Sequence, residues 1–213
     1  MRKFNLFFVV VAVAISIAPS LSNATNITFT SDGTINNGDI FDSVSVYDTP
    51  PNHTTITMYG GSVEYFNTFD ESISNIQGGT ITKAIHAGNL STINISAGNL
   101  IDKLWVHNDA IINITGGVFP NGWWVIDGSG TINISGGLLN ITYTKFYGNH
   151  SVNIWGYGFN YDSATDLLTG YLSDDSPFSI KVPSLTGINL IPEPASAFLL
   201  GLGIVLARRK LSK

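Results

Sequence analysis

The sequence TINISAG at residues 92–98 returns as IINITGG at 111–117 and as TINISGG at 131–137. The Gly pair that ends this pattern, or a near equivalent of it, recurs at intervals of 18, 19, 19, 20 and 20 residues. Its six places are Gly60-Gly61, Gly78-Gly79, Ala97-Gly98, Gly116-Gly117, Gly136-Gly137 and Gly156-Tyr157-Gly158. A fixed period of this length is the signature of a repeat architecture.

Each repeat opens with a strand in which apolar and polar residues alternate. Ile93 and Ile95 fall on one face and Asn94 on the other, because successive side chains of a strand point to opposite sides. A Gly corner and two further short strands, such as 99–101 and 104–106, would close one coil. Stacking such coils about 4.8 Å apart buries the Ile column and pairs the backbone between coils.

The sequence therefore predicts an all-β fold, a parallel β-helix (solenoid) of about six coils of 18–20 residues over residues 54–160. Residues 25–53 lack the clean repeat and are expected to form an N-terminal cap. Within the predicted cap and linker at 161–191, the apolar segments 167–172 and 178–182 predict a β-hairpin that covers the last coil. A β-sandwich or propeller is the competing fold, and the handedness of the helix stays open.

The first 24 residues predict a cleavable signal peptide. Arg2 and Lys3 precede an apolar run at residues 4–18, and the small residues Ser22-Asn23-Ala24 place the cleavage by signal peptidase after Ala24. An N-terminal membrane anchor is the alternative, although the apolar run is short for a span that needs about 20 residues.

The other end combines three elements in order. Pro192-Glu193-Pro194 is followed by 13 uncharged, mostly apolar residues at 195–207 and then by Arg208, Arg209 and Lys210. Thirteen helical residues rise about 20 Å, so 195–207 predicts a short transmembrane helix. The basic cluster would stop it on the cytoplasmic side.

This tail, opposite a signal peptide, resembles the PEP-CTERM sorting signal of Gram-negative bacteria. The resemblance implies recognition by an exosortase, a membrane cysteine protease and transpeptidase, with cleavage near Pro192-Glu193-Pro194. It also implies a precursor held transiently in the inner membrane and a product at the cell surface or outside the cell. Because the family is associated with exopolysaccharide and biofilm producers, the biofilm matrix is an expected partner. An ordinary tail anchor is the alternative.

Composition narrows the function further. Only 12% of the residues are charged, against roughly 25% in ordinary soluble domains, and there is no cysteine to form disulfides or ligate zinc. The net charge of −5 divides into +2 for residues 1–24, −10 for 25–191 and +3 for 192–213. The acidic middle argues against a nucleic-acid partner and makes an anionic polysaccharide a less favoured ligand.

Catalytic and metal-binding groups are not indicated. Residues 25–191 contain no arginine to serve as the base of a lyase, and the adjacent pair Asp174-Asp175 falls in a predicted turn. His53, His86, His107 and His150 do not share one offset from the Gly pairs, so they are expected to be surface residues. No catalytic residue, metal or cofactor is therefore expected.

Aromatic residues suggest a ligand platform instead. His86, Trp105 and Trp124 each follow the last Gly of a corner by seven residues, so stacked coils should align them. Alternation points Trp105 and Trp124 outward, where flat rings suit sugars or protein partners. A core ladder with the register shifted by one is the alternative. Tyr157, Phe159 and Tyr161 form a second patch, with packing against the C-terminal hairpin as its alternative.

The expected function is that of an exported, exosortase-processed, non-catalytic structural protein of the cell surface or extracellular matrix. A carbohydrate-binding surface module is the alternative, followed by a polysaccharide-active enzyme. Surface glycosylation is also suggested by eight Asn-x-Ser/Thr sequons, of which Asn94, Asn113 and Asn133 lie in the repeat strand.

Overall fold

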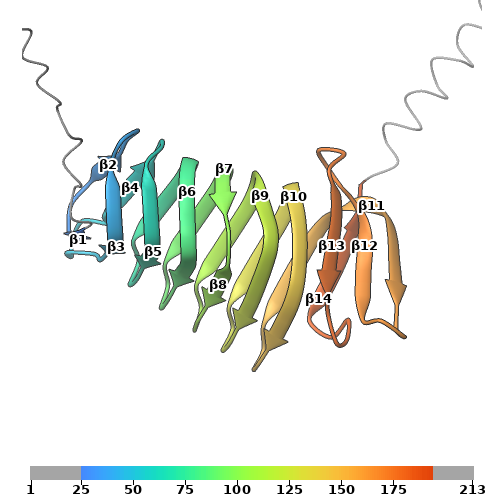
Figure 1. Cartoon of the computed structure of the whole chain (residues 1–213). Helices are drawn as coiled ribbons and strands as arrows, with labels where there is room; N and C mark the ends of the chain where they lie inside the picture. Colours follow the sequence, from blue (N-terminus) through green and yellow to red (C-terminus); the bar gives the residue numbers. More distant parts are fainter. Residues whose placement is uncertain (1–24, 194–213) are drawn as a thin grey trace, which may run out of the picture.

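The computed structural model describes residues 25–193, and these residues form an all-β solenoid of about six turns, stacked along one axis (Figure 1). The predicted signal peptide with Ala24 lies outside the described residues, as do Pro194, the predicted helix 195–207 and Arg208, Arg209 and Lys210. Within the described part, no helix is long and apolar enough to cross a membrane.

One sheet contains all the strands. They are β1 (Thr25–Phe29), β2 (Gly33–Ile35), β3 (Ile40–Val46), β4 (Thr55–Met58), β5 (Ser62–Thr68), β6 (Ile73–Ala87), β7 (Thr92–Leu100), β8 (Lys103–Val106), β9 (Ile111–Ile126), β10 (Thr131–Phe146), β11 (Ser151–Asp162), β12 (Leu167–Leu172), β13 (Pro177–Lys181) and β14 (Ile188–Pro192). The longest strands, β6, β9 and β10, run through their Gly corners.

Equivalent residues of successive coils are paired in parallel. Asn94 of β7 lies beside Asn113 of β9, which lies beside Asn133 of β10. This pairing confirms the predicted parallel β-helix and excludes the sandwich and the propeller, whose neighbouring strands are antiparallel.

The two glycines of a corner serve different purposes. A Cβ on Gly116 would lie 2.1 Å from the carbonyl oxygen of Ser96 in the preceding coil, so the first glycine permits close contact between coils. Gly117 has a φ of +93°, so the second glycine permits a left-handed turn.

A second corner carries its own column of left-handed residues, which the repeat pattern did not reveal. Asp70, Asn89 and Asn108 have φ values of 58°, 59° and 56°, and Gly128 and Gly148 continue the column at 68° each. Asn and Asp tolerate this conformation better than other non-glycine residues. Asn89 also donates from Nδ2 to Asp70 Oδ1 at 2.9 Å, which ties this corner to the previous coil.

The interior is filled by columns of aliphatic side chains. Ile93, Ile112 and Ile132 lie in register and are fully buried. A second buried column crosses the opposite wall and contains Val44, Phe66, Ile85, Leu104 and Trp124. The alternation of the repeat strand thus separates core and surface as predicted.

Asparagines form a ladder on the outer face of the same strands. Asn94, Asn113, Asn133 and Asn153 each donate from Nδ2 to Oδ1 of the asparagine one coil earlier, at 2.8–2.9 Å. Asn75 begins the ladder, and Asn189 of β14 extends it with a bond of 2.8 Å to Asn153. Since every inner amide both donates and accepts, the ladder fixes the register from outside.

The two ends of the solenoid differ from its regular coils. The segment expected to be the N-terminal cap contributes β1, β2 and β3, which pair in parallel with β3, β4 and β5 respectively. At the other end, β12 and β13 form the antiparallel hairpin that the sequence predicted. It lies between β10 and β11, pairing with β10 through β13 and with β11 through β12. The prediction that the hairpin covers the last coil is therefore wrong, because the hairpin is inserted into the sheet and the edge strand at this end is β14.

Substitution of Asn113 by Asp should break the middle of the ladder. The carboxylate can accept from Asn133 but cannot donate to Asn94 Oδ1, so two oxygens would face each other. We expect the free energy of unfolding in urea to fall by about 1–3 kcal/mol. Asn121→Asp, at an exposed asparagine outside the ladder, is the control. Equal losses in the two variants would contradict a stabilising ladder.

Candidate functional site

Two of the three predicted platform residues lie side by side. His86 of β6 is the register partner of Trp105 of β8, and their rings meet edge to face with centroids 5.8 Å apart. Trp105 lies between the buried Leu104 and Val106 and is half-buried on the outer surface. The outward orientation predicted for Trp105 is therefore confirmed.

The outward orientation predicted for Trp124 is wrong. Trp124 pairs with Leu104, not with Trp105, and is only 1% exposed in the core. The reason is one additional residue: four positions separate Asn99 from Lys103, whereas five separate their partners Val118 and Trp123. The shift turns Trp124 inward and leaves Trp123 48% exposed on the surface.

Exposed and half-buried rings nevertheless form an oblique row with one gap, which we call the aromatic stripe. It comprises Tyr47, Phe69, His86, Trp105, Trp123 and Tyr143. Neighbouring centroids lie 5.1 Å apart for Tyr47 and Phe69, 5.2 Å for Phe69 and His86, 5.8 Å for His86 and Trp105, and 5.1 Å for Trp123 and Tyr143. The stripe crosses the wall formed by the middle strands of successive coils.

Lysine bridges the one gap in the stripe. Lys103 Nζ lies 6.0 Å from the ring centroids of both Trp105 and Trp123, within the range of a cation–π interaction. Lys145, on the next coil but one, lies 5.0 Å from the ring of Tyr147, and the hydrogen bond with the Tyr147 hydroxyl raises the pKa of Lys145. Neither lysine forms an ion pair with any of residues 25–193, whereas Lys83 pairs with Glu64.

Two histidines on this wall differ in electrostatic environment. The rings of His86 and His107 are 4.7 Å apart, although the two residues occupy different columns. Burial and the proximity of His107 lower the pKa of His86, and Asp127 opposes this only in part. His107 instead contacts Asp127, with 2.6 Å between Nδ1 and Oδ2. The lowered pKa of His86 favours its neutral form.

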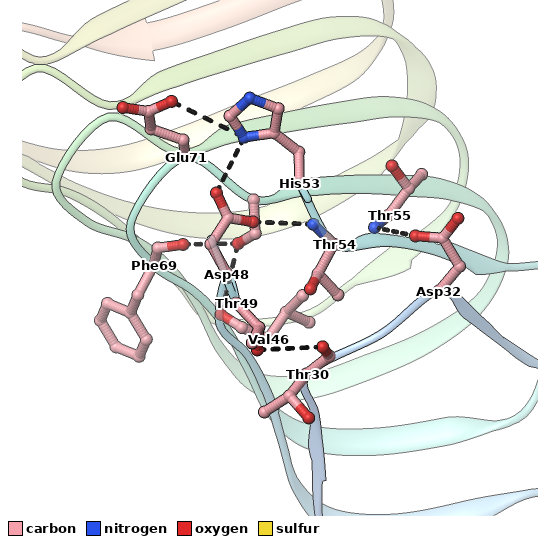
Figure 2. A network of polar contacts seen from close by, with 11 residues as sticks. Thr30, Asp32, Val46, Asp48, Thr49, His53, Thr54, Thr55, Phe69 and Glu71 are labelled. Carbon is pink, nitrogen blue, oxygen red and sulfur yellow. Dashed lines mark hydrogen bonds and ion pairs between the residues drawn. The ribbon is translucent and has the colours of Figure 1, made fainter. Parts of the chain in front are cut away.

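A separate polar cluster lies in the loop between β3 and β4. His53 Nδ1 is 2.9 Å from Asp48 Oδ2 and 3.6 Å from Glu71 Oε2, and Figure 2 shows the two carboxylates converging on the ring. The Asp48 side chain is 6% exposed, and its Oδ1 accepts a 2.7 Å hydrogen bond from the Thr54 backbone. Asp48 thus positions His53 and closes the loop at the start of β4.

This cluster has consequences for charge and for metal binding. The hydrogen bond and the charge of Asp48 raise the pKa of His53, and Glu71 adds a smaller effect. The three ligand atoms lie within 4.8 Å of one another, so the donor set could hold a divalent cation. The sequence offered no signal for it, because the three residues lie in a loop and a turn outside the repeat.

Tyr157, Phe159 and the acidic pair serve the C-terminal cap. Tyr157 stacks on Tyr171 of β12 at 5.5 Å, and Phe159 lies 6.2 Å from Phe178 of β13. Asp174 accepts hydrogen bonds from the backbone of Gly137 and Ser176, at 2.9 and 3.0 Å. The patch therefore packs against the hairpin, and the turn role expected for Asp174 is confirmed.

The two described residues of the predicted sorting motif belong to the end of the solenoid. Pro192 is the last residue of β14 and lies beside Gly156 of β11. The Glu193 backbone donates a 3.1 Å hydrogen bond to the Gly156 carbonyl. The motif thus begins where the sheet ends, with no intervening linker.

The sequons of the repeat strand are engaged in the ladder. The Nδ2 atoms of Asn94, Asn113 and Asn133, the atoms to which a glycan would attach, donate the ladder hydrogen bonds. A glycan at any of these three positions would replace one of the two Nδ2 hydrogens and leave the other to donate the ladder bond.

Comparison of the chain with protein-family models, with curated proteins and with solved structures gave no match. Its geometry defines it as a parallel β-solenoid with an aromatic stripe on one wall.

Replacement of Asp48 by Asn should remove most of the upward shift in the pKa of His53, measured by NMR titration of the imidazole. Glu71→Gln should lower this pKa by less. The pKa of His53 is higher in the folded protein than in the unfolded chain, where it is about 6.5. Protonated His53 therefore stabilises the fold fully when the pH is below the unfolded-state pKa. This stabilisation is lost as the pH rises through the folded-state pKa. An unshifted pKa in the unmodified protein would contradict the Asp48 contact.

The register shift can be tested with two adjacent tryptophans. Trp124→Ala should lower the free energy of unfolding by about 3–5 kcal/mol, because it empties a core site. Trp123→Ala should change it by about 1 kcal/mol or less, since the ring is on the surface. Urea denaturation of both variants would reject the assigned register if their losses were equal or reversed.

Proposed function

We propose that this chain is an exported, non-catalytic structural protein of the cell surface or extracellular matrix, processed by an exosortase. The observation that carries the proposal is the junction at Pro192. The solenoid ends at this residue, and the Pro-Glu-Pro triplet, the apolar segment 195–207 and the basic cluster follow directly.

The architecture supports a display role. A solenoid is stabilised by contacts between neighbouring coils, so it forms a rod whose length is set by the number of repeats. The core columns and the asparagine ladder run along this rod, and the hairpin β12–β13 is inserted into its C-terminal part. Such a rod keeps its surface side chains in fixed positions relative to one another, and no disulfide is needed for this.

The polar residues support a structural role over a catalytic one. Asp48 and Asp174 hold backbone N–H groups of neighbouring segments. Asp175 accepts a 2.8 Å hydrogen bond from the Tyr157 hydroxyl. These carboxylates are thus occupied in closing loops and caps.

Processing is tested by changing the motif and measuring the product. In the producing organism, Pro192→Ala and Glu193→Ala should each leave uncleaved precursor in the inner-membrane fraction, detected by intact-mass spectrometry. Pro183→Ala, at an exposed proline outside the motif, is the matched control and should be processed normally. Normal processing of both motif variants would overturn the proposed exosortase recognition.

A further inference from the structure

We propose that the aromatic stripe, together with Lys103 and Lys145, binds a chain of acidic polysaccharide that crosses the outer wall of the solenoid obliquely from coil to coil. This inference goes beyond the structural role proposed above and does not depend on exosortase processing.

The shape of the stripe suits a linear polymer. Its six rings come from six neighbouring strands, just after β3 and β5 and within β6, β8, β9 and β10. The row is displaced by two residues along the strands between Phe69 and His86 and again between Trp105 and Trp123, so it runs obliquely across the wall. With strands about 4.8 Å apart, five steps span roughly 24 Å, which exceeds the length of a single sugar. Small ligands bind in concave pockets, whereas this row of rings lies on the outer wall of a sheet.

The chemistry of the rings suits sugars. Trp123 is 48% exposed and Tyr143 39% exposed, and their rings are tilted by only 39° with centroids 5.1 Å apart. A pyranose ring presents an apolar C–H face that packs on an aromatic face, while its hydroxyls remain in water. Indole N–H and phenol O–H groups at the edges can bond those hydroxyls.

The distribution of charge selects an acidic sugar. Residues 25–193 contain four lysines and no arginine, and three of these lysines, Lys83, Lys103 and Lys145, lie over aromatic rings of this wall. Lys103 lies between Trp105 and Trp123, and neither it nor Lys145 is neutralised by an acid among the described residues. In a domain that is otherwise strongly acidic, a uronate carboxylate or a sulfate would find its partners here.

The lysines are concentrated on one wall, although the domain as a whole is acidic. The net charge of −10 on residues 25–191 disfavours polyanions over the surface as a whole. This net charge would repel an acidic chain from the rest of the surface. The chain would bind only at the wall where unpaired lysine ammonium groups lie beside aromatic rings.

Binding can be measured by isothermal titration calorimetry with the full-length protein in detergent. The probes are polygalacturonate and alginate as acidic glycans, dextran as a neutral glycan and polyglutamate as an acidic polymer without sugars. We expect the acidic glycans to bind at least tenfold more tightly than dextran and polyglutamate. Their affinity should also fall as NaCl rises from 20 to 500 mM, because salt screens the lysines.

Variants separate the two components of the site. Trp123→Ala with Tyr143→Ala, and separately Lys103→Gln with Lys145→Gln, should each weaken binding at least tenfold. Tyr59→Ala, at an exposed tyrosine just after β4, and Lys181→Gln, at the fourth lysine of residues 25–193, should change the affinity less than twofold. Unchanged circular dichroism and melting temperature establish that each variant is folded.

Three results would overturn the proposal. The first is the absence of binding to both acidic glycans at low salt. The second is equal binding of dextran or polyglutamate, which would indicate stacking alone or charge alone. The third is an equal loss in the stripe variants and the control variants.

Discussion

The backbone hydrogen bonds between successive coils are the constraint on which the rest of the structure depends. Thr92 N donates to Ser72 O at 3.0 Å, and Ile111 N donates to Ser91 O at 2.9 Å, so a residue is positioned by another one coil earlier. Because the pairing is parallel and in register, identical side chains fall into columns. The buried isoleucines and the asparagine ladder follow directly from this repeat. The aromatic stripe lies on the same paired strands but moves between columns from coil to coil.

The sequence predicted the columns where the repeat is regular and failed where its length changes. The alternation around Asn94 was sufficient to separate core from surface. Counting from the Gly pair misplaced Trp124, because β9 carries an additional residue between that corner and the tryptophan. Counting back from the second corner succeeds, since His86, Trp105 and Val125 each precede a left-handed residue by three positions. The sequence did not reveal this corner as a repeat, because its left-handed position is occupied by Asp, Asn or Gly in different coils.

The candidate sites differ in how well the sequence predicted them. Aromatic side chains on the strands inherit their spacing from the repeat, so their approximate alignment was predictable. Contacts that cross between columns, such as His86 with His107, depend on side-chain conformation and were not. The sequence also did not predict the cluster of Asp48, His53 and Glu71, since a non-repeating loop brings these residues together. Net charge likewise concealed the concentration of lysines on one wall.

The in-register parallel stack is the central claim, and nuclear Overhauser effects between labelled strands test it most directly. In the full-length protein, backbone contacts should link Ile93 with Ile112, Asn94 with Asn113 and Ile95 with Ile114, with both partners advancing together along the chain. The account predicts the same series between residues 111–114 and 131–134. Contacts in which one partner advances while the other recedes would show antiparallel pairing and contradict the solenoid.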